Sequence, residues 1–199
     1  NGGQTCIAPD YVLLVGDAAR RDALVQALRE QVIARYGDLS ASGDYTRIIN
    51  DAQFARLDGY LDDARGRGLT VVPLAPAHDR AQRLFAPTLV LEPGDDAAVM
   101  QDEIFGPILP IRSVPSLEAA IAEVNARDRP LALYPFSDDR ASVERILADT
   151  LAGGVTVNDT VLHFGINTLP FGGIGPSGMG AYHGRAGFDA MSKALPILW

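Results

Sequence analysis

Short apolar segments alternate with amphipathic helical patterns along the whole chain, and this alternation limits the folds open to it. Short apolar runs bounded by turn residues are typical of buried strands. Strands that alternate with helices build α/β domains, in which the helical crossovers make most of the strands parallel. The sequence therefore predicts an α/β fold with a largely parallel sheet flanked by helices.

The expected strands are apolar runs, several of which end at glycine or proline. Proline lacks the amide proton that a sheet ladder needs, so Pro135 is expected to end its strand early or to place it at an edge. The expected strands cover residues 11–15, 69–72, 88–91, 109–114, 131–134 and 155–157.

The expected helices are segments in which apolar residues recur three or four positions apart. Asp17, Ser116 and Asp138 are the expected N-caps of three of them, because their side chains can accept a hydrogen bond from a first-turn amide. Gly37 is expected to end the first helix, and the chain from residue 162 onward is expected to be irregular. The expected inward-facing residues are Leu24, Val25, Leu28, Val32 and Tyr36, then Phe54, Leu57, Leu61 and Ala64, then Leu117, Ala120, Ile121 and Val124, and finally Val143, Ile146, Leu147 and Leu151.

Length and charge narrow the class of protein. The chain has 199 residues, 47% of them hydrophobic, enough to bury the core of one domain. Its net charge of −8 disfavours nucleic acid and anionic membranes as main partners, because both bind basic patches. No apolar run approaches the roughly 18 residues of a membrane span. A single cysteine suits a reducing cytoplasm, and it shows no metal-ligand spacing with the three histidines.

Residues 1–10 contain the only cysteine, Cys6, directly after a segment with two glycines. A thiol on a glycine-rich loop can be approached closely by another backbone or by a ligand. Most free cysteines, however, are small buried hydrophobic residues without chemistry. Both interpretations stay open on this segment alone.

Two further loops combine residue types that can bind a ligand. Glu103 and Phe105 lie in an acidic–aromatic turn that ends in Gly106-Pro107. A carboxylate can accept hydrogen bonds from both hydroxyls of a ribose, and an aromatic ring nearby can pack on the attached group. Phe171 could line an apolar pocket beside a thiol. Taken alone, the first loop is better explained as an ordinary surface turn and Phe171 as a core residue.

The segment 173–178 matches the Gly-x-Gly-x-x-Gly pattern of dinucleotide-binding loops. That pattern requires a preceding strand and a helix opening from it, whereas Pro176 and the further glycines disfavour a helix here. We therefore expect a tight loop that packs against other backbone.

A cysteine hydrolase is an alternative interpretation of the same residues. Cys6 could use His163 or His183 as its base, with Asn158 or Asn167 orienting the imidazole. The flanks of Cys6 carry no protease-like signature.

Taken together and in order, these segments resemble the C-terminal catalytic portion of the NAD(P)-dependent aldehyde dehydrogenase superfamily. Residues 1–9 resemble its active-site cysteine segment and residues 101–110 its Glu-Ile-Phe-Gly-Pro cofactor loop. Residues 154–158 and 169–180 resemble the strand before its substrate loop and that loop itself. The likeness covers nearly the whole chain.

Finer features resemble one branch of that superfamily. Residues 44–50 and 180–184 are similar to the class 3-like branch. Within it, residues 158–163 and 173–180 are most similar to bacterial coniferyl aldehyde dehydrogenases. Pro135 departs from the pattern, because relatives usually carry an aliphatic residue in that strand.

The resemblance implies a site and a reaction. Cys6 would be the catalytic nucleophile, which forms a thiohemiacetal and then a thioester with an aromatic aldehyde such as coniferaldehyde. Glu103 would hold the ribose of NAD or NADP, and Phe105 would pack against it. Phe171 would line the aldehyde pocket, while Tyr182 and His183 belong to the branch motif. The full-length enzyme would be a homodimer or homotetramer.

In this family, the general-base glutamate and an oxyanion-hole asparagine precede the cysteine, as do the dinucleotide-binding domain and the oligomerisation hairpin. We therefore expect residues 1–199 to be the catalytic domain of a longer enzyme, inactive alone and self-associating through exposed sheet edges. A CoA-acylating aldehyde dehydrogenase or an acyl-phosphate reductase of the same fold is an alternative, as is a non-catalytic fragment.

Overall fold

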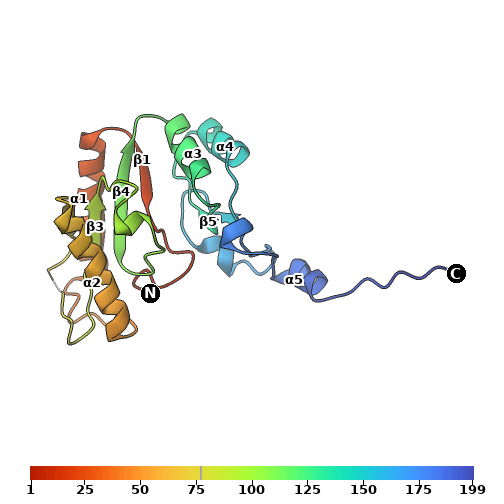
Figure 1. Cartoon of the computed structure of the whole chain (residues 1–199), viewed down its shortest axis with the longest axis horizontal. Helices are drawn as coiled ribbons and strands as arrows, with labels where there is room; N and C mark the ends of the chain where they lie inside the picture. The colour runs from red at the N-terminus through yellow and green to blue at the C-terminus, as the bar shows by residue number, and fades with distance from the viewer. Residues whose placement is uncertain (77) are drawn as a thin grey trace. The chain divides into compact units, whose positions relative to one another are not determined.

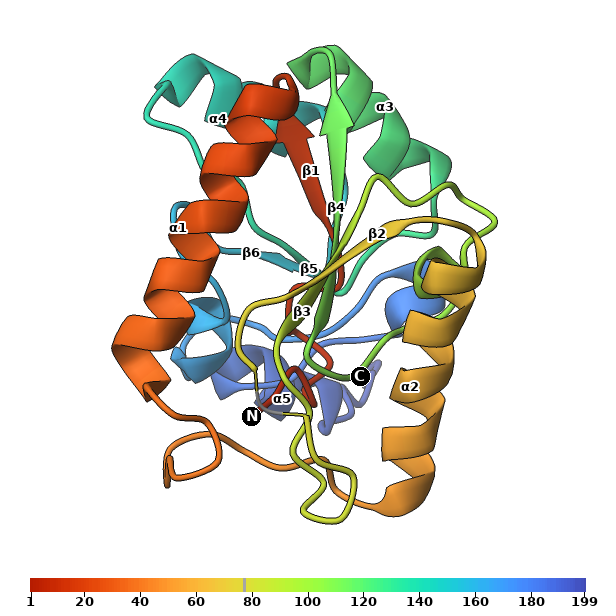
Figure 2. The same ribbon diagram turned by 90° about the vertical axis from the view of Figure 1, so that its left-hand side faces the viewer.

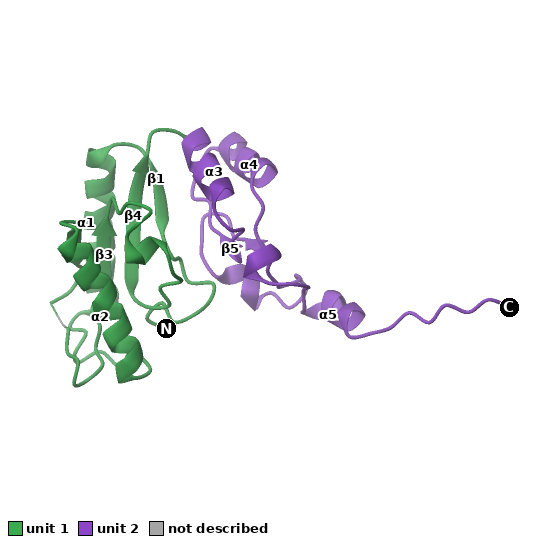
Figure 3. Cartoon of the chain, in the orientation of Figure 1, with its two compact units in different colours: residues 1–116 green, residues 117–199 purple. Residues whose placement is uncertain are grey.

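The computed structural model describes residues 1–76 and 78–199 and divides the chain into two compact units, residues 1–116 and 117–199 (Figure 3). All six expected strands and all four expected helices are present, with ends that differ from the expected bounds by a few residues at most. The single catalytic domain expected over residues 1–199 stays a prediction.

Unit 1 contains a four-stranded sheet with the order β1-β4-β3-β2 (Figure 1). β4 pairs in parallel with both β1 and β3, whereas β2 pairs antiparallel with β3 at the edge. This arrangement confirms the largely parallel sheet that the alternating sequence pattern predicts. The strands are β1 (Val12–Val15), β2 (Thr70–Pro73), β3 (Thr88–Leu91) and β4 (Ile108–Val114).

Two long helices cover the two faces of this sheet (Figure 2). Helix α1 (Ala18–Tyr36) begins at Asp17, whose carboxylate accepts a hydrogen bond from the Arg20 amide at 3.1 Å, and it ends at Gly37 with φ +56°. Its apolar stripe packs on Leu89 and Ile111. Helix α2 (Asp51–Gly66) packs on the opposite face.

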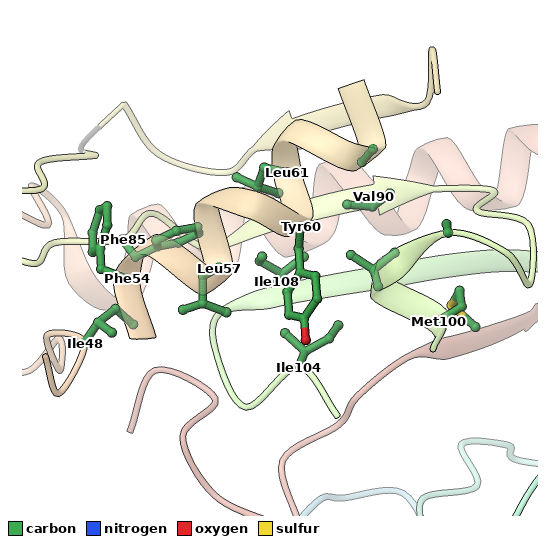
Figure 4. Packing of buried hydrophobic residues seen from close by; sticks show 13 residues of the cluster. Ile48, Phe54, Leu57, Tyr60, Leu61, Phe85, Val90, Met100, Ile104 and Ile108 are labelled. Atoms are coloured by element: carbon green, nitrogen blue, oxygen red, sulfur yellow. The ribbon is translucent and has the colours of Figure 1, made fainter. Parts of the chain in front are cut away.

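The largest buried cluster lies under α2 (Figure 4). Phe54, Leu57 and Leu61 of the helix are almost completely buried there, together with Val90 of β3. Ile104, which lies in the loop before β4, belongs to the same cluster and is 1% exposed. The hydrophobic core therefore fixes the middle of that loop as well as the helix.

Unit 2 is built around two short parallel strands, β5 (Ala132–Leu133) and β6 (Gly154–Val155). β5 ends before Pro135, as expected. The helices of unit 2 are α3 (Leu117–Ala126), α4 (Arg140–Asp149) and α5 (Gly184–Ala190). Helix α5 lies in the segment expected to be irregular, because its glycines hide the helical pattern.

Two expectations for α4 are wrong. Asp139 is the N-cap instead of Asp138, and its carboxylate accepts hydrogen bonds from the amides of Ala141 and Ser142. The helix begins one residue later than expected, so Asp138 lies too far from the first turn. Within unit 2, α4 buries Val143, whereas Leu147 is 46% exposed. Leu151, also expected to face inward, lies beyond the end of the helix and is 48% exposed.

Replacing Leu57 by alanine is expected to destabilise unit 1 by about 2–5 kcal/mol, because it leaves a cavity in the core under α2. The measurement is urea-induced unfolding. Ile33→Ala on α1 is the matched control, because Ile33 is 56% exposed, and it should change the free energy of unfolding by less than about 1 kcal/mol. Equal losses in the two variants would contradict this description of the core.

Candidate functional site

Cys6 lies in a loop at the start of unit 1, which we call the cysteine loop (residues 1–10). Its side chain is exposed, while that of the next residue, Ile7, is buried. The interpretation of Cys6 as a small core residue is therefore wrong for this unit. The buried isoleucine anchors the loop and leaves the thiol available to react.

Gln4 ties the cysteine loop to the segment before α2. Its side-chain oxygen accepts a hydrogen bond from the Ile49 amide at 3.0 Å, and its side-chain nitrogen donates to the Arg47 carbonyl at 3.1 Å. The Gln4 side chain therefore pairs with one backbone N–H and one backbone C=O of the segment before α2, as an adjacent strand would. The sequence alone indicated no role for Gln4, although the residue lies inside the cysteine motif.

The cysteine loop packs directly on a second loop, residues 101–107, which we call the glutamate loop. Gly3 has φ +72°, and a Cβ placed on it would lie 2.2 Å from the carbonyl oxygen of Gly106. Only a glycine permits this approach of the two backbones. The contact brings the loop of Cys6 beside the loop of Glu103 and Phe105, about 100 residues apart in sequence.

A partly buried carboxylate makes a second connection between the two loops. Asp10 accepts a hydrogen bond from the Ile104 amide at 2.9 Å. Burial raises the pKa of the Asp10 carboxyl above its ordinary value, and the neighbouring Glu103 carboxylate acts in the same direction. The bond from the Ile104 amide and the charge of Arg56 lower that pKa and so offset part of the shift.

Helix α2 holds the glutamate loop from its other side. Arg56 donates to the Ile104 carbonyl at 2.7 Å and to the Tyr60 hydroxyl at 3.1 Å. Tyr60 in turn donates to the Asp102 carboxylate at 3.3 Å. Gln53 accepts a hydrogen bond from Arg56 at 2.7 Å. Residues 53, 56 and 60 are spaced so that they share one face of a helix, and this spacing is the sequence signal for their common role. None of the motifs described above includes these residues.

A cavity of about 580 Å³ opens between α2 and the two loops. Glu103 and Phe105 both contribute to its wall, and their expected contacts with a cofactor ribose stay a prediction. Phe105 is 42% exposed and has a left-handed backbone, with φ +48°. The full lining consists of Gln4, Ile49, Asn50, Gln53, Arg56, Tyr60, Asp102, Glu103 and Phe105.

Phe171 lies in unit 2, at the centre of an aromatic cluster. Its backbone pairs with that of Tyr182 through two hydrogen bonds of 2.8 Å. Its ring stacks with the imidazoles of His163 and His183, both at a centroid distance of 5.9 Å, and the residue is 7% exposed. Its expected contact with an aldehyde stays a prediction.

His163 is a buried histidine that packs in the same aromatic cluster. Its Nδ1 lies 2.8 Å from the Thr156 hydroxyl, and that same hydroxyl oxygen accepts a hydrogen bond from the His163 amide at 3.3 Å. Thr156 therefore contacts both the ring and the backbone amide of His163. Burial lowers the pKa of His163 below its ordinary value.

The arrangement around Asn158 bears on the cysteine hydrolase alternative. The Asn158 side chain accepts from the Ser137 amide at 2.8 Å and donates to the Ser137 carbonyl at 3.1 Å. It therefore orients a loop of unit 2 and is not the partner of His163, whose Nδ1 contacts Thr156. The assignment of Asn158 as an orienting residue for that histidine is wrong.

The segment 173–178 is a tight loop, as expected. A Cβ on Gly173 would lie 2.2 Å from the Ser177 carbonyl oxygen, and residues Gly175–Ser177 form a single 3₁₀ turn. Among residues 1–76 and 78–199, no group of three or more His, Cys, Asp or Glu side chains is placed to hold a metal ion. None of the helices in the described part of the chain is long and apolar enough to span a membrane.

Comparison with known proteins identifies the family. Residues 1–195 match the model of the aldehyde dehydrogenase family. The chain belongs to this family. It is 52% identical over 197 residues to a probable coniferyl aldehyde dehydrogenase of Pseudomonas aeruginosa, covering 99% of the chain and 40% of that relative. It is 46% identical to aldehyde dehydrogenase family 3 member A2 of Rattus norvegicus, covering 100% of the chain and 40% of that relative.

Solved aldehyde dehydrogenases share the fold. A substrate-bound Staphylococcus aureus AldH is 38% identical, with a TM-score of 0.87, and the match covers 100% of this chain and 44% of that one. A betaine aldehyde dehydrogenase of the same organism, solved with NAD+, is 26% identical, with a TM-score of 0.80, over 95% of this chain and 38% of that one. The likeness to the curated relatives confirms the class 3-like and coniferyl-type resemblance. The chain spans about 40% of the length of those relatives.

Replacing Gly3 by alanine is expected to destabilise unit 1 by more than about 1 kcal/mol, because its Cβ would collide with the Gly106 carbonyl at a positive φ. The measurement is the urea midpoint of unfolding. Gly43→Ala is the control, because a Cβ there meets nothing within 4 Å. A stability loss no larger than that of the control would contradict the backbone contact between the loops.

His163 predicts a pH dependence for the stability of unit 2. Because the folded-state pKa lies below the ordinary value of 6.5, the unfolded chain binds the proton first, and stability is lost as pH falls below about 6.5. His163→Phe keeps an aromatic ring and removes the titration, so its unfolding midpoint should change less between about pH 7.5 and 5.5. The same pH dependence in both proteins would contradict the prediction.

Proposed function

We propose that this chain supplies the cysteine-bearing catalytic portion of a NAD(P)-dependent aldehyde dehydrogenase. The proposed substrate is an aromatic aldehyde such as coniferaldehyde, which is oxidised to the carboxylic acid. The observation that carries the proposal is the packing of the cysteine loop on the glutamate loop through Gly3 and Gly106. This contact brings the loop with the exposed Cys6 thiol against the loop with the exposed Glu103 carboxylate.

Cys6 is the proposed nucleophile. Its thiolate forms a bond to the aldehyde carbon, and the carbonyl oxygen becomes an alkoxide. A backbone amide of the cysteine loop, such as that of Cys6, can donate to this oxygen. Loss of hydride from the same carbon leaves a thioester on Cys6, and water then releases the carboxylic acid and the thiol.

The walls of the cavity fit the cofactor. NAD(P)+, when bound, accepts the hydride. The exposed Glu103 carboxylate can accept from both ribose hydroxyls, and the exposed Phe105 ring can pack against the same ribose. Arg56 and Tyr60 keep the loop that carries both residues against α2.

Phe171 is the proposed aldehyde contact. Stacking with the imidazoles of His163 and His183 and edge contacts with Phe164 and Tyr182 fix the orientation of its ring. Only the small exposed part of this rigidly held ring would touch an aromatic substrate. The names of the coniferyl aldehyde dehydrogenases among the relatives support this substrate class.

The remaining proposals concern the full-length enzyme. We propose that it works in the cytoplasm, which the single free cysteine supports, and that it is a homodimer or homotetramer. The chain spans about 40% of its relatives, so we propose that the second oxyanion donor, the general base and most of the cofactor site lie elsewhere in the enzyme. The isolated chain should then show no turnover.

The test is whether the full-length enzyme reduces NAD+ or NADP+ with coniferaldehyde as substrate. The absorbance of the reduced cofactor measures the rate. Cys6→Ser should lower kcat by a factor on the order of 10³ or more, because the hydroxyl is a far weaker nucleophile at neutral pH. Turnover by the isolated 199-residue chain would contradict the proposed division of the site.

Product analysis separates the alternatives. Free acid formed without added acceptor supports the hydrolytic dehydrogenase. An absolute requirement for CoA or phosphate would favour the acyl-transferring enzymes of the same fold. Ester hydrolysis that depends on Cys6 and a histidine but not on NAD(P)+ would favour the cysteine hydrolase.

A further inference from the structure

The backbone of one residue of the glutamate loop, Ile104, is held from both sides. The amide of Ile104 donates to the Asp10 carboxylate at 2.9 Å, and its carbonyl accepts from Arg56 at 2.7 Å. The Ile104 side chain is buried in the cluster under α2. Its neighbours, Glu103 and Phe105, are exposed on the cavity wall. Two ligand-facing side chains therefore flank one fully anchored residue.

The two side chains that hold the Ile104 backbone come from different parts of unit 1. Arg56 belongs to α2, where Gln53 and Tyr60 hold its guanidinium. Asp10 belongs to the cysteine loop, four residues after Cys6. The bond from Ile104 to Asp10 therefore joins the segment that carries the thiol to the segment that carries Glu103 and Phe105.

The electrostatic setting of Asp10 is unfavourable for a charge. The carboxyl is partly buried, and the Glu103 carboxylate is a neighbouring like charge, while Arg56 is the neighbouring cation that offsets them. An asparagine could accept the same hydrogen bond without any charge. The geometry at this position therefore requires an acceptor for the Ile104 amide, which either side chain provides.

We propose that Asp10 is a positioning residue, which fixes the Glu103–Phe105 segment relative to Cys6 through its hydrogen bond to the Ile104 amide. In the proposed function, these flanking residues hold the cofactor, so Asp10 sets the place of the cofactor ribose with respect to the thiol. The inference rests on that proposed function. It adds a residue that touches neither substrate nor cofactor.

The test compares Asp10→Ala and Asp10→Asn in the full-length enzyme. Asp10→Ala removes the acceptor and should raise KM for NAD(P)+ about tenfold, the equivalent of one hydrogen bond to a charged group. The KM for the aldehyde should change less than about twofold. Asp10→Asn retains an acceptor oxygen and should bring KM for NAD(P)+ back to within about threefold of the wild type.

Asp17→Ala is the matched control. Asp17 also accepts one backbone amide, that of Arg20 at the start of α1, and its loss should lower the urea midpoint of unfolding without changing KM for NAD(P)+. Hydrogen exchange of a peptide covering residues 102–106 gives a second readout, which Asp10→Ala should accelerate and Asp17→Ala should not. Asp10→Ser, whose hydroxyl is too short to replace the carboxylate, takes the place of the alanine variant if that variant unfolds.

Three results would overturn the inference: a KM for NAD(P)+ in Asp10→Ala no higher than in Asp17→Ala, no rescue by Asp10→Asn, or unchanged exchange of residues 102–106. Failure of the proposed function is a different result, because the wild-type enzyme would then lack Cys6-dependent reduction of NAD(P)+. Faster exchange in Asp10→Ala would still establish the connection between the loops in that case.

Discussion

Unit 1 depends on a contact between two stretches of bare backbone, Gly3 in the cysteine loop and Gly106 in the glutamate loop. Neither glycine contributes a side chain, and it is the absence of one at Gly3 that lets the two loops meet. Side-chain hydrogen bonds then hold each loop in this position. Gln4 holds one loop to the segment before α2, and Arg56 holds the other to α2 itself. The cavity wall that carries Glu103 and Phe105 follows from this arrangement.

Much of the fold was predictable because it follows from local pattern. The strands and helices of unit 1 have near-expected bounds, since apolar periodicity and helix caps act over a few residues. The errors have equally local causes. Asp138 and Asp139 are identical acids at adjacent positions, so composition could not choose the cap. The exposure of Leu147 depends on the size of unit 2, which no single helix pattern contains.

The candidate site was predictable only in part. Motifs named Cys6, Glu103 and Phe105, and the cavity brings the last two together. The residues that hold them in place, Asp10 and Arg56, bond to backbone atoms 94 and 48 positions away. Backbone atoms are present at every position, so a sequence carries no signal for such a partner. Phe171 shows the opposite case, since its aromatic neighbours are visible in the sequence but their stacking on it is not.

Phe105 illustrates what a rigid loop does for binding. A bulky residue with φ +48° lies in a left-handed conformation that costs of order 1–3 kcal/mol and persists only when its surroundings enforce it. Here the anchored Ile104 on one side and the packed Gly106 on the other enforce it. Folding therefore provides the free energy for this strained backbone, and the Phe105 ring is already exposed on the cavity wall before any ligand binds. A preorganised wall loses little conformational entropy on association, so more of its contact energy remains as affinity.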